Sequence, residues 1–188
     1  MSASSRRATD PGGRAGQSGQ SVVEFALSIP VLLTMLFAML NIGVLIADKV
    51  SAAYAVRQGA RLAAELGSGG ASGLTTIQID QNVCQAVVAS ASKLAFAAVQ
   101  EIDIYQADVG GSTTGTFDAV NDPYDNYDSS CNQLAHQNFP NTSRKQVPPN
   151  ETSIGVNLKW TYTAPTGYQA LSLTLSDYAV EKAAPVLS

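Results

Sequence analysis

An uninterrupted apolar segment near the N-terminus constrains this chain more than any other feature. Residues 25–47 contain no charged side chain. A helix rises about 1.5 Å per residue, so this segment would extend roughly 34 Å, enough to cross a bilayer with some tilt. Its few polar residues, and its Gly and Pro, are of the kinds that membrane helices tolerate. The sequence therefore predicts a membrane-spanning helix rather than the core helix of a soluble domain.

The residues before this segment predict its orientation. Residues 1–19 are rich in Ser, Gly and Arg and show no apolar periodicity, so we expect them to be a disordered leader. Their positive charge lies directly before the span, which predicts an N-inside, C-outside orientation. A secretory signal is the competing interpretation. The apolar segment is long for such a signal, however, and no small-x-small cleavage site follows it before Asp48.

Glu24 is the one carboxylate at the edge of the apolar segment. Carrying it to mid-membrane would cost about 2.5–3.5 kcal/mol, and such residues usually mark function. If the chain were cut after Gly19, Gln20 would carry a free α-amine, and the i, i+4 spacing would place amine and carboxylate on one helix face. Glu24 would alternatively pair with the amine of a neighbouring subunit, or simply lie at the headgroup boundary.

These residues resemble a known family. Four residues separate Gly19 from Glu24-Phe25-Ala26-Leu27, Pro30 follows, and residues 55–61 read Ala-Val-Arg-Gln-Gly-Ala-Arg. The pattern is similar to the TadE-like minor pilins, or pseudopilins, of the tight-adherence (Flp) type IV pilus. The likeness is strong over residues 19–66 and weaker over 173–185. Major Flp pilins are much shorter and lack a large distal domain, which favours a minor subunit.

The resemblance implies a location, partners and a role. A prepilin peptidase would cut between Gly19 and Gln20, and Glu24 and Phe25 would serve assembly. Membrane lipid, other pilins and the Tad assembly platform would be the partners, first in the cytoplasmic membrane and then at the cell surface. The subunit would prime, cap or decorate the pilus and support surface adhesion. The alternative is an unprocessed, single-span binding module whose head recognises a glycan, a surface or an envelope protein.

A stripe of smaller residues repeats every four positions within the span. Such a stripe lets another helix approach closely, although ordinary lipid-facing composition is the alternative. Pro30 removes one backbone hydrogen bond and clashes with the carbonyl of residue 26, which predicts a local kink or melted turn. The members of the stripe are Ala26, Pro30, Thr34 and Ala38.

The rest of the chain predicts an α+β head. We expect the first helix to continue to residue 66, a Gly/Ser linker at 67–73 and a head domain at 74–188. Within the head, residues 74–97 have a helical apolar period. Strands are expected at 99–108, at 154–162 and from 171, and a long polar loop at about 110–151. Together these elements predict one helix packed on a small antiparallel sheet, as in pilins.

Cys84 and Cys131 are the only cysteines. Outside the membrane such a pair is expected to oxidise. The bridge would tie the second helix to the long loop, with a stabilisation of about 4 kcal/mol in the chain-entropy model. Two separated thiols remain the alternative, because sequence does not give their distance.

Other chemistry finds little support in the sequence. An acidic loop offers oxygen ligands for calcium, but its spacing is not that of an EF-hand and Asp is also an ordinary turn residue; otherwise no cofactor or metal is expected. The net charge of −4 argues against nucleic-acid binding. His136, the sole histidine, lacks a nucleophile arrangement around it, so we do not expect an enzyme. The calcium candidates are Asp118, Asp122, Asp125 and Asp128.

Overall fold

The computed structural model describes residues 17–67, 73–107, 115–147, 150–166 and 172–184. Residues 1–16 of the predicted leader (1–19) and residues 68–72 of the predicted linker (67–73) lie outside the described residues. The chain divides into two compact units, residues 1–40 and 41–188, which are described separately here. The fold class is α+β, as predicted, with a long apolar helix, a second helix and a five-stranded antiparallel sheet.

The N-terminal unit, where described, is the first part of helix α1 (Gln17–Leu66). The helix begins three residues before the predicted start at Gln20. It passes through Pro30 without interruption, so the predicted melted turn is not present in the described helix. Proline still has no N–H to donate, and the Ala26 carbonyl therefore lacks its usual helical partner.

The second unit is built on an antiparallel sheet with strand order β3-β2-β1-β4-β5. The central strand β1 (Ala97–Gln106) pairs with β2 (Tyr124–Tyr127) on one side and with β4 (Ser153–Thr163) on the other. The outer strands are β3 (Gln133–Gln137) beside β2 and β5 (Ser172–Lys182) beside β4. The predicted strands β1, β4 and β5 are therefore confirmed.

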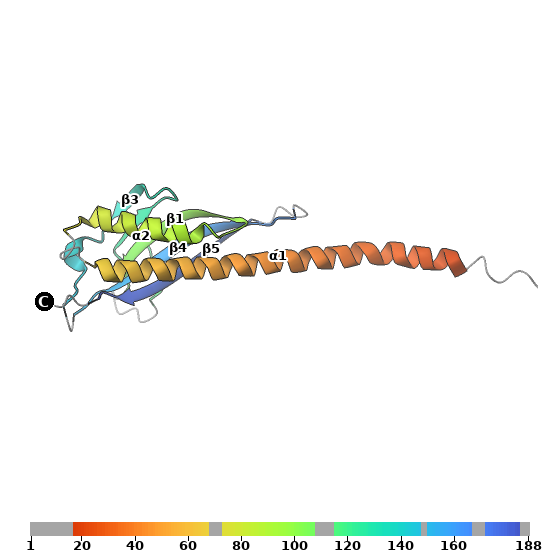
Figure 1. Ribbon diagram of the computed structural model, residues 1–188, viewed down its shortest axis with the longest axis horizontal. Helices are drawn as coiled ribbons and strands as arrows, with labels where there is room; N and C mark the ends of the chain where they lie inside the picture. The colour runs from red at the N-terminus through yellow and green to blue at the C-terminus, as the bar shows by residue number, and fades with distance from the viewer. Residues whose placement is uncertain (1–16, 68–72, 108–114, 148–149, 167–171, 185–188) are drawn as a thin grey trace, which may run out of the picture. The chain divides into compact units, whose positions relative to one another are not determined.

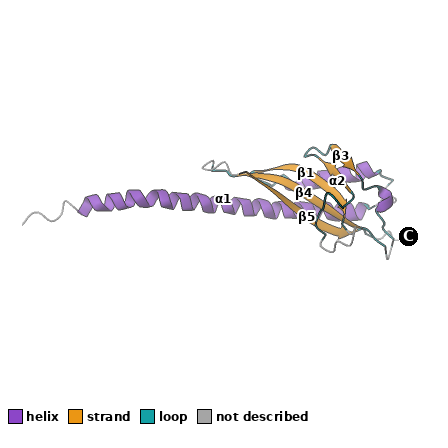
Figure 2. Cartoon of the chain, turned by 180° about the vertical axis from the view of Figure 1, so that it is seen from behind, coloured by secondary structure: helices purple, strands orange, loops and turns teal. Residues whose placement is uncertain are grey.

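Helix α2 (Thr76–Ala91) and the part of α1 from Asn41 onward belong to the same unit as the sheet, and both pack on one of its faces (Figures 1 and 2). Alternate side chains of the strands point toward these helices, as the period of two requires. They form one buried core with the helices, whose strand residues are Ile102, Ile104, Tyr127, Ile154, Val156, Leu158, Trp160 and Tyr162.

Small residues let α1 approach the core closely. Ala52, Ala55, Ala60 and Ala63 are almost fully buried. Gly59 lies where an added Cβ would overlap the side chain of Val87 on α2 and come within 3.4 Å of Val156 Cγ1 on β4. The second half of the predicted stalk helix is thus one wall of the head's core.

Helix α2 begins at a capping box and ends earlier than predicted. The Thr75 hydroxyl accepts a hydrogen bond from Gln78 N, and the Gln78 side chain accepts one from Thr75 N. The prediction extended this helix to residue 97, but it stops at Ala91. Asp48 of α1 explains the difference, since its carboxylate accepts hydrogen bonds from Ala95 N at 2.8 Å and Phe96 N at 3.2 Å. These amides are therefore satisfied outside the helix.

The prediction of one long loop at about 110–151 is wrong in part. It contains strands β2 and β3 and a short 3₁₀ helix (Asn141–Ser143). The predicted disulfide is confirmed: Cys84 of α2 is bonded to Cys131 in the turn between β2 and β3, with Cα atoms 5.7 Å apart. The bridge holds these two short strands against α2, on the side of the sheet farthest from β5.

Candidate functional site

The first candidate site is the exposed apolar part of α1. Every side chain from Gly19 to Leu40 is exposed, including the large apolar ones. Among the described residues, α1 is the one helix long and apolar enough to cross a membrane. An apolar surface of this length is not stable in water. It requires either lipid or the apolar helices of other chains, so the segment is a candidate both for anchoring and for assembly.

Glu24 lies where the sequence pattern places it, near the start of this helix. The Gln20 side-chain amide donates to Glu24 Oε1 at 3.1 Å, which shows that positions 20 and 24 share a helix face. Gly19 lies within α1, and a Cβ added there would meet no neighbouring side chain within 4 Å. The Ser28 hydroxyl donates back to the Glu24 carbonyl at 2.8 Å. Phe25, the next residue, is exposed to the extent of 67%.

The predicted helix-packing stripe is exposed along its whole length: Ala26, Pro30, Thr34 and Ala38. Thr34 donates its hydroxyl hydrogen bond to the Val31 carbonyl at 2.8 Å, within its own helix. The one hydroxyl of the stripe, that of Thr34, is therefore already hydrogen-bonded and does not need a partner on a neighbouring helix. This arrangement is compatible with close approach of a second helix.

The head holds α1 from Asn41 onward. The Tyr162 hydroxyl of β4 donates to the Asn41 carbonyl at 3.0 Å, and the Asn41 amide donates to the Thr166 hydroxyl at 3.0 Å. Asp48, buried against the α2–β1 connection, provides a second attachment, and Lys49 forms an exposed ion pair with Asp177 of β5. These contacts attach this part of the helix to the head, so the two are expected to move together.

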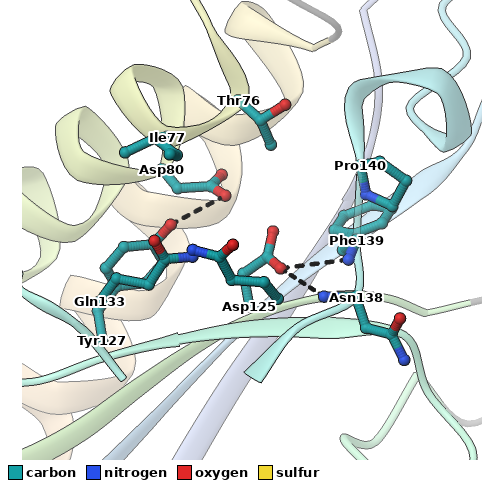
Figure 3. A pocket seen from close by; sticks show the side chains of 10 residues that line it. Thr76, Ile77, Asp80, Asp125, Tyr127, Gln133, Asn138, Phe139 and Pro140 are labelled. Carbon is teal, nitrogen blue, oxygen red and sulfur yellow. Dashed lines mark hydrogen bonds between the residues drawn. The ribbon is translucent and has the colours of Figure 1, made fainter. Parts of the chain in front are cut away.

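The second candidate site is a hollow of about 340 Å³ between α2 and the β2–β3 hairpin (Figure 3). Asp80 of α2 and Asp125 of β2 point toward its floor, with Tyr127 donating to Asp80 at 3.3 Å. The Arg144 guanidinium lies beneath them, paired with Asp80 and at 3.2 Å from Asp125 Oδ2. Burial raises the pKa of Asp80 to about 6, although Arg144 opposes the rise.

Both carboxylates of this hollow already have hydrogen-bond partners. Asp125 Oδ1 accepts hydrogen bonds from Asn138 N and Phe139 N, as Figure 3 shows, and Oδ2 accepts from Arg144. Arg144 also donates to the Phe139 carbonyl and lies over the Phe139 ring. We therefore interpret this cluster as structural, since it joins α2, β2 and the segment after β3.

The third candidate site is a groove of about 390 Å³ on the sheet face opposite the helices. Its floor comes from β1, β4 and β5, and the segment that leads into β2 forms a wall. Asp103 and Glu101 of β1 lie beside Asn157 and Lys159 of β4. This groove combines carboxylate, amide and ammonium groups with an aromatic ring, Phe117.

The four calcium candidates do not come together. Asp118 and Asp122 are joined by a local hydrogen bond from Asp118 N to Asp122 Oδ2 at 2.7 Å, whereas Asp125 belongs to the Arg144 cluster and Asp128 caps the β2–β3 turn. Backbone and side-chain donors in these turns lower the pKa of Asp118 and of Asp128. The described residues contain no group of three Asp, Glu, His or Cys side chains placed to hold a metal ion. The turn-residue interpretation fits Asp118, Asp122 and Asp128, whereas Asp125 lies in β2 and pairs with Arg144.

His136 of β3 is exposed and stacks on the Tyr124 ring, with centroids 4.4 Å apart. Sequence reasoning missed the roles of Asp48, Arg144 and Asp103, whose partners are distant along the chain. Asp48 alone carried a signal, because it is the first charge after the apolar segment.

Comparison with known proteins supports the N-terminal site. Residues 19–61 match the family described as TadE-like protein. No curated protein and no solved structure matches the chain significantly. The match includes Glu24, the exposed apolar helix and the start of the part of α1 that packs in the head. The sheet lies outside it.

Proposed function

We propose that this chain, whose residues 19–61 match the TadE-like family, is a minor pilin of a tight-adherence (Flp) pilus. The precursor is held in the cytoplasmic membrane by α1, with its basic leader inside and its head outside. A prepilin peptidase cuts it between Gly19 and Gln20. The processed subunit then enters the pilus through its apolar helix and primes, caps or decorates the filament.

One observation carries this proposal. Helix α1 is continuous, yet its side chains from Gln20 to Leu40 are all exposed and mostly apolar, while from Ala52 its small residues are buried in the head. A helix with these two parts suits a subunit that inserts one end among like helices and displays a folded domain at the other. The role is mechanical and needs no catalytic group.

The position of Glu24 supports the assembly step. Its contact with the Gln20 side chain places the two residues on one helix face. After cleavage the new α-amine of Gln20 lies within the same helical turn. An amine–carboxylate pair would lower the cost of keeping Glu24 in an apolar environment, which is about 2.5–3.5 kcal/mol for an unpaired charge at mid-membrane. Pairing with the amine of a neighbouring subunit gives the same neutralisation and would also fix the register between subunits.

The head is suited to the outer side of the membrane. Its disulfide links α2 to the β2–β3 turn, and such bonds persist in oxidising compartments. The leader's three arginines predict the same orientation by the positive-inside rule. We therefore place the head outside the cytoplasm, where it supports adhesion to surfaces. The pilin partners and the assembly platform meet α1, and the head remains free for other contacts.

The decisive experiment is the intact mass of the protein extracted from the membranes of its native host. Loss of residues 1–19 is the expected result, and substitution of Gly19 by Leu is expected to block it. A chain that keeps residues 1–19 in a host with active prepilin peptidase would contradict the proposal. That outcome would favour the second candidate, an unprocessed single-span module that binds through the groove on the outer sheet face.

A further inference from the structure

The groove on the outer sheet face has the features of a ligand site rather than of a solvated surface. Its volume of about 390 Å³ falls in the range of small-ligand pockets. It lies on the face that the two helices leave uncovered, and its floor is formed by strands β1, β4 and β5 rather than by a loop. Side chains on such a floor are held in fixed positions by their strand neighbours.

Asp103 is the central residue of this floor. Its side chain lines the groove but is only 3% exposed. Asp103 Oδ2 accepts a hydrogen bond from the Asn157 amide at 2.9 Å. Among the described residues no donor is bonded to the other oxygen, Oδ1. Oδ1 is not one of the fully enclosed polar atoms, so it is open to the groove and can accept a hydrogen bond from a ligand.

Burial raises the pKa of Asp103 to about 6, and the nearby Glu101 carboxylate adds to the rise, while Asn157 and Lys159 oppose it. Glu101 itself is fixed, because Oε1 accepts from the Asn126 amide at 2.9 Å and Oε2 lies 3.6 Å from Lys159 Nζ. Lys159 is about half exposed and retains further donors. The floor thus offers acceptors and donors side by side.

The wall of the groove is aromatic and rigid. The Phe117 ring lies 5.1 Å from that of Tyr105 and 5.0 Å from that of Tyr124, the latter edge-to-face. Tyr124 is backed in turn by His136. The Tyr105 hydroxyl donates to the Gly115 carbonyl and so secures the start of this wall. The two tyrosine rings therefore hold the Phe117 ring in position, as an apolar surface beside the polar floor of the groove.

These groups together select the class of ligand. Two carboxylates against one lysine disfavour phosphate and other anions. A purely apolar ligand would displace water from Asp103 Oδ1 without replacing its hydrogen bond. A sugar hydroxyl both donates and accepts, so it matches neighbouring carboxylate and amide groups, and a sugar ring carries C–H groups that pack on an aromatic side chain. We propose that this groove binds a short saccharide, with Asp103 and Asn157 hydrogen-bonded to its hydroxyls and a ring face against Phe117.

The test uses the full-length chain in micelles of a detergent without a sugar headgroup. Saturation-transfer NMR is recorded with glucose, galactose, mannose and N-acetylglucosamine and with lactose, maltose and chitobiose, each at about 10 mM, where weak monosaccharide binding is measurable. The expected result is transfer to at least one of these probes. No transfer to any of them would overturn the proposal.

Two groove variants and one control locate the binding. Asp103→Asn keeps the shape of the side chain, and Lys159→Met changes a half-exposed residue with little risk to folding. Each is expected to weaken binding about tenfold or more, because each removes a charged hydrogen-bonding partner. Glu181→Gln, on exposed β5 outside the groove, is expected to bind like the unmodified chain.

Equal binding by all three variants would place the sugar elsewhere and contradict the assignment. Methylammonium at the same concentration tests the other ligand that a carboxylate pair attracts. Transfer to methylammonium without transfer to any saccharide would also overturn the proposal. The readout is binding to purified protein, so it does not depend on cleavage at Gly19 or on pilus assembly.

Discussion

The Arg144 guanidinium forms a bidentate ion pair with the Asp80 carboxylate in the interior of the head, and the two side chains are 1% and 0% exposed. The residues are 64 positions apart, and Asp125 shares the same guanidinium. The cluster joins α2 to β2 and to the segment after β3. The Cys84–Cys131 bridge fastens the same side of the head covalently.

We predict that Arg144→Met lowers the free energy of unfolding by roughly 3–5 kcal/mol, because it leaves two buried carboxylates without their cation. Denaturant unfolding of the full-length protein in micelles measures the change. Arg61→Met is the matched control, since Arg61 forms an exposed i, i+4 pair with Glu65. It should have little effect, because exposed pairs contribute little. Similar losses in both variants would show that the Arg144 cluster is not important for stability.

Gly59 and Gly43 provide a second comparison within one helix. An alanine methyl at position 59 would overlap Val87, whereas at position 43 it would meet no atom within 4 Å. We expect Gly59→Ala to destabilise the head by about 1–3 kcal/mol through overpacking. Gly43→Ala should be neutral or stabilising by up to about 1 kcal/mol, since alanine is the better helix former. Thermal unfolding followed by circular dichroism distinguishes the two. Equal melting temperatures would contradict the close packing described here.

Asp103 predicts a pH dependence of stability. Its pKa is raised to about 6 in the folded chain from an ordinary value of 3.8, chiefly by burial. The folded state then binds more protons than the unfolded state between these values, so this contribution to stability is fully present below about pH 4 and is lost as the pH rises through 6.

We therefore expect the stability of the unmodified chain to fall between pH 4 and 6.5, and Asp103→Asn to make that decline shallower. Asp80, whose pKa is raised to the same value, keeps part of the slope in both proteins. Unfolding midpoints measured in a pH series provide the test. An unchanged slope in the variant would exclude Asp103 as a source of the dependence.

Substitution of Glu24 tests the proposed assembly step in cells. Glu24→Ala is expected to insert in the membrane normally, because the change makes the segment more apolar, but to abolish support of pilus formation. Membrane fractionation and electron microscopy of surface pili measure the two properties. Glu181→Ala, an exposed carboxylate change on β5, is the control and should leave piliation intact. Normal piliation with Glu24→Ala would exclude the amine–carboxylate pair from the mechanism.

The sequence was most informative where a pattern was long. The apolar segment predicted α1, and the alternation at Ile154, Val156 and Leu158 predicted β4, which buries these residues as expected. The cysteine pair predicted the disulfide. Each of these features depends on residue type and local spacing, which sequence displays directly.

Strand β2 shows why the rest was not predictable. Its sequence, Tyr-Asp-Asn-Tyr, is typical of a turn, yet all four residues are buried. Asp125 is compensated by Arg144, and Asn126 by Glu101, across the fold. Similarly, Asp103 alternates with Ile102 and Ile104 and has the pattern of a solvated strand face. Asp103 is nevertheless only 3% exposed, in a groove that is also lined by Phe117, from a segment whose position the local sequence does not specify.

The packing of α1 in the head also affects how the protein can be divided. Ala52, Ala55, Ala60 and Ala63 belong to the same core as Trp160 and Val156. A truncated chain that starts at the predicted head boundary, residue 74, would expose one side of that core to water. The smallest piece expected to fold as a water-soluble unit starts near Asn41, so a transplanted or secreted form of this domain must carry its own length of helix with it.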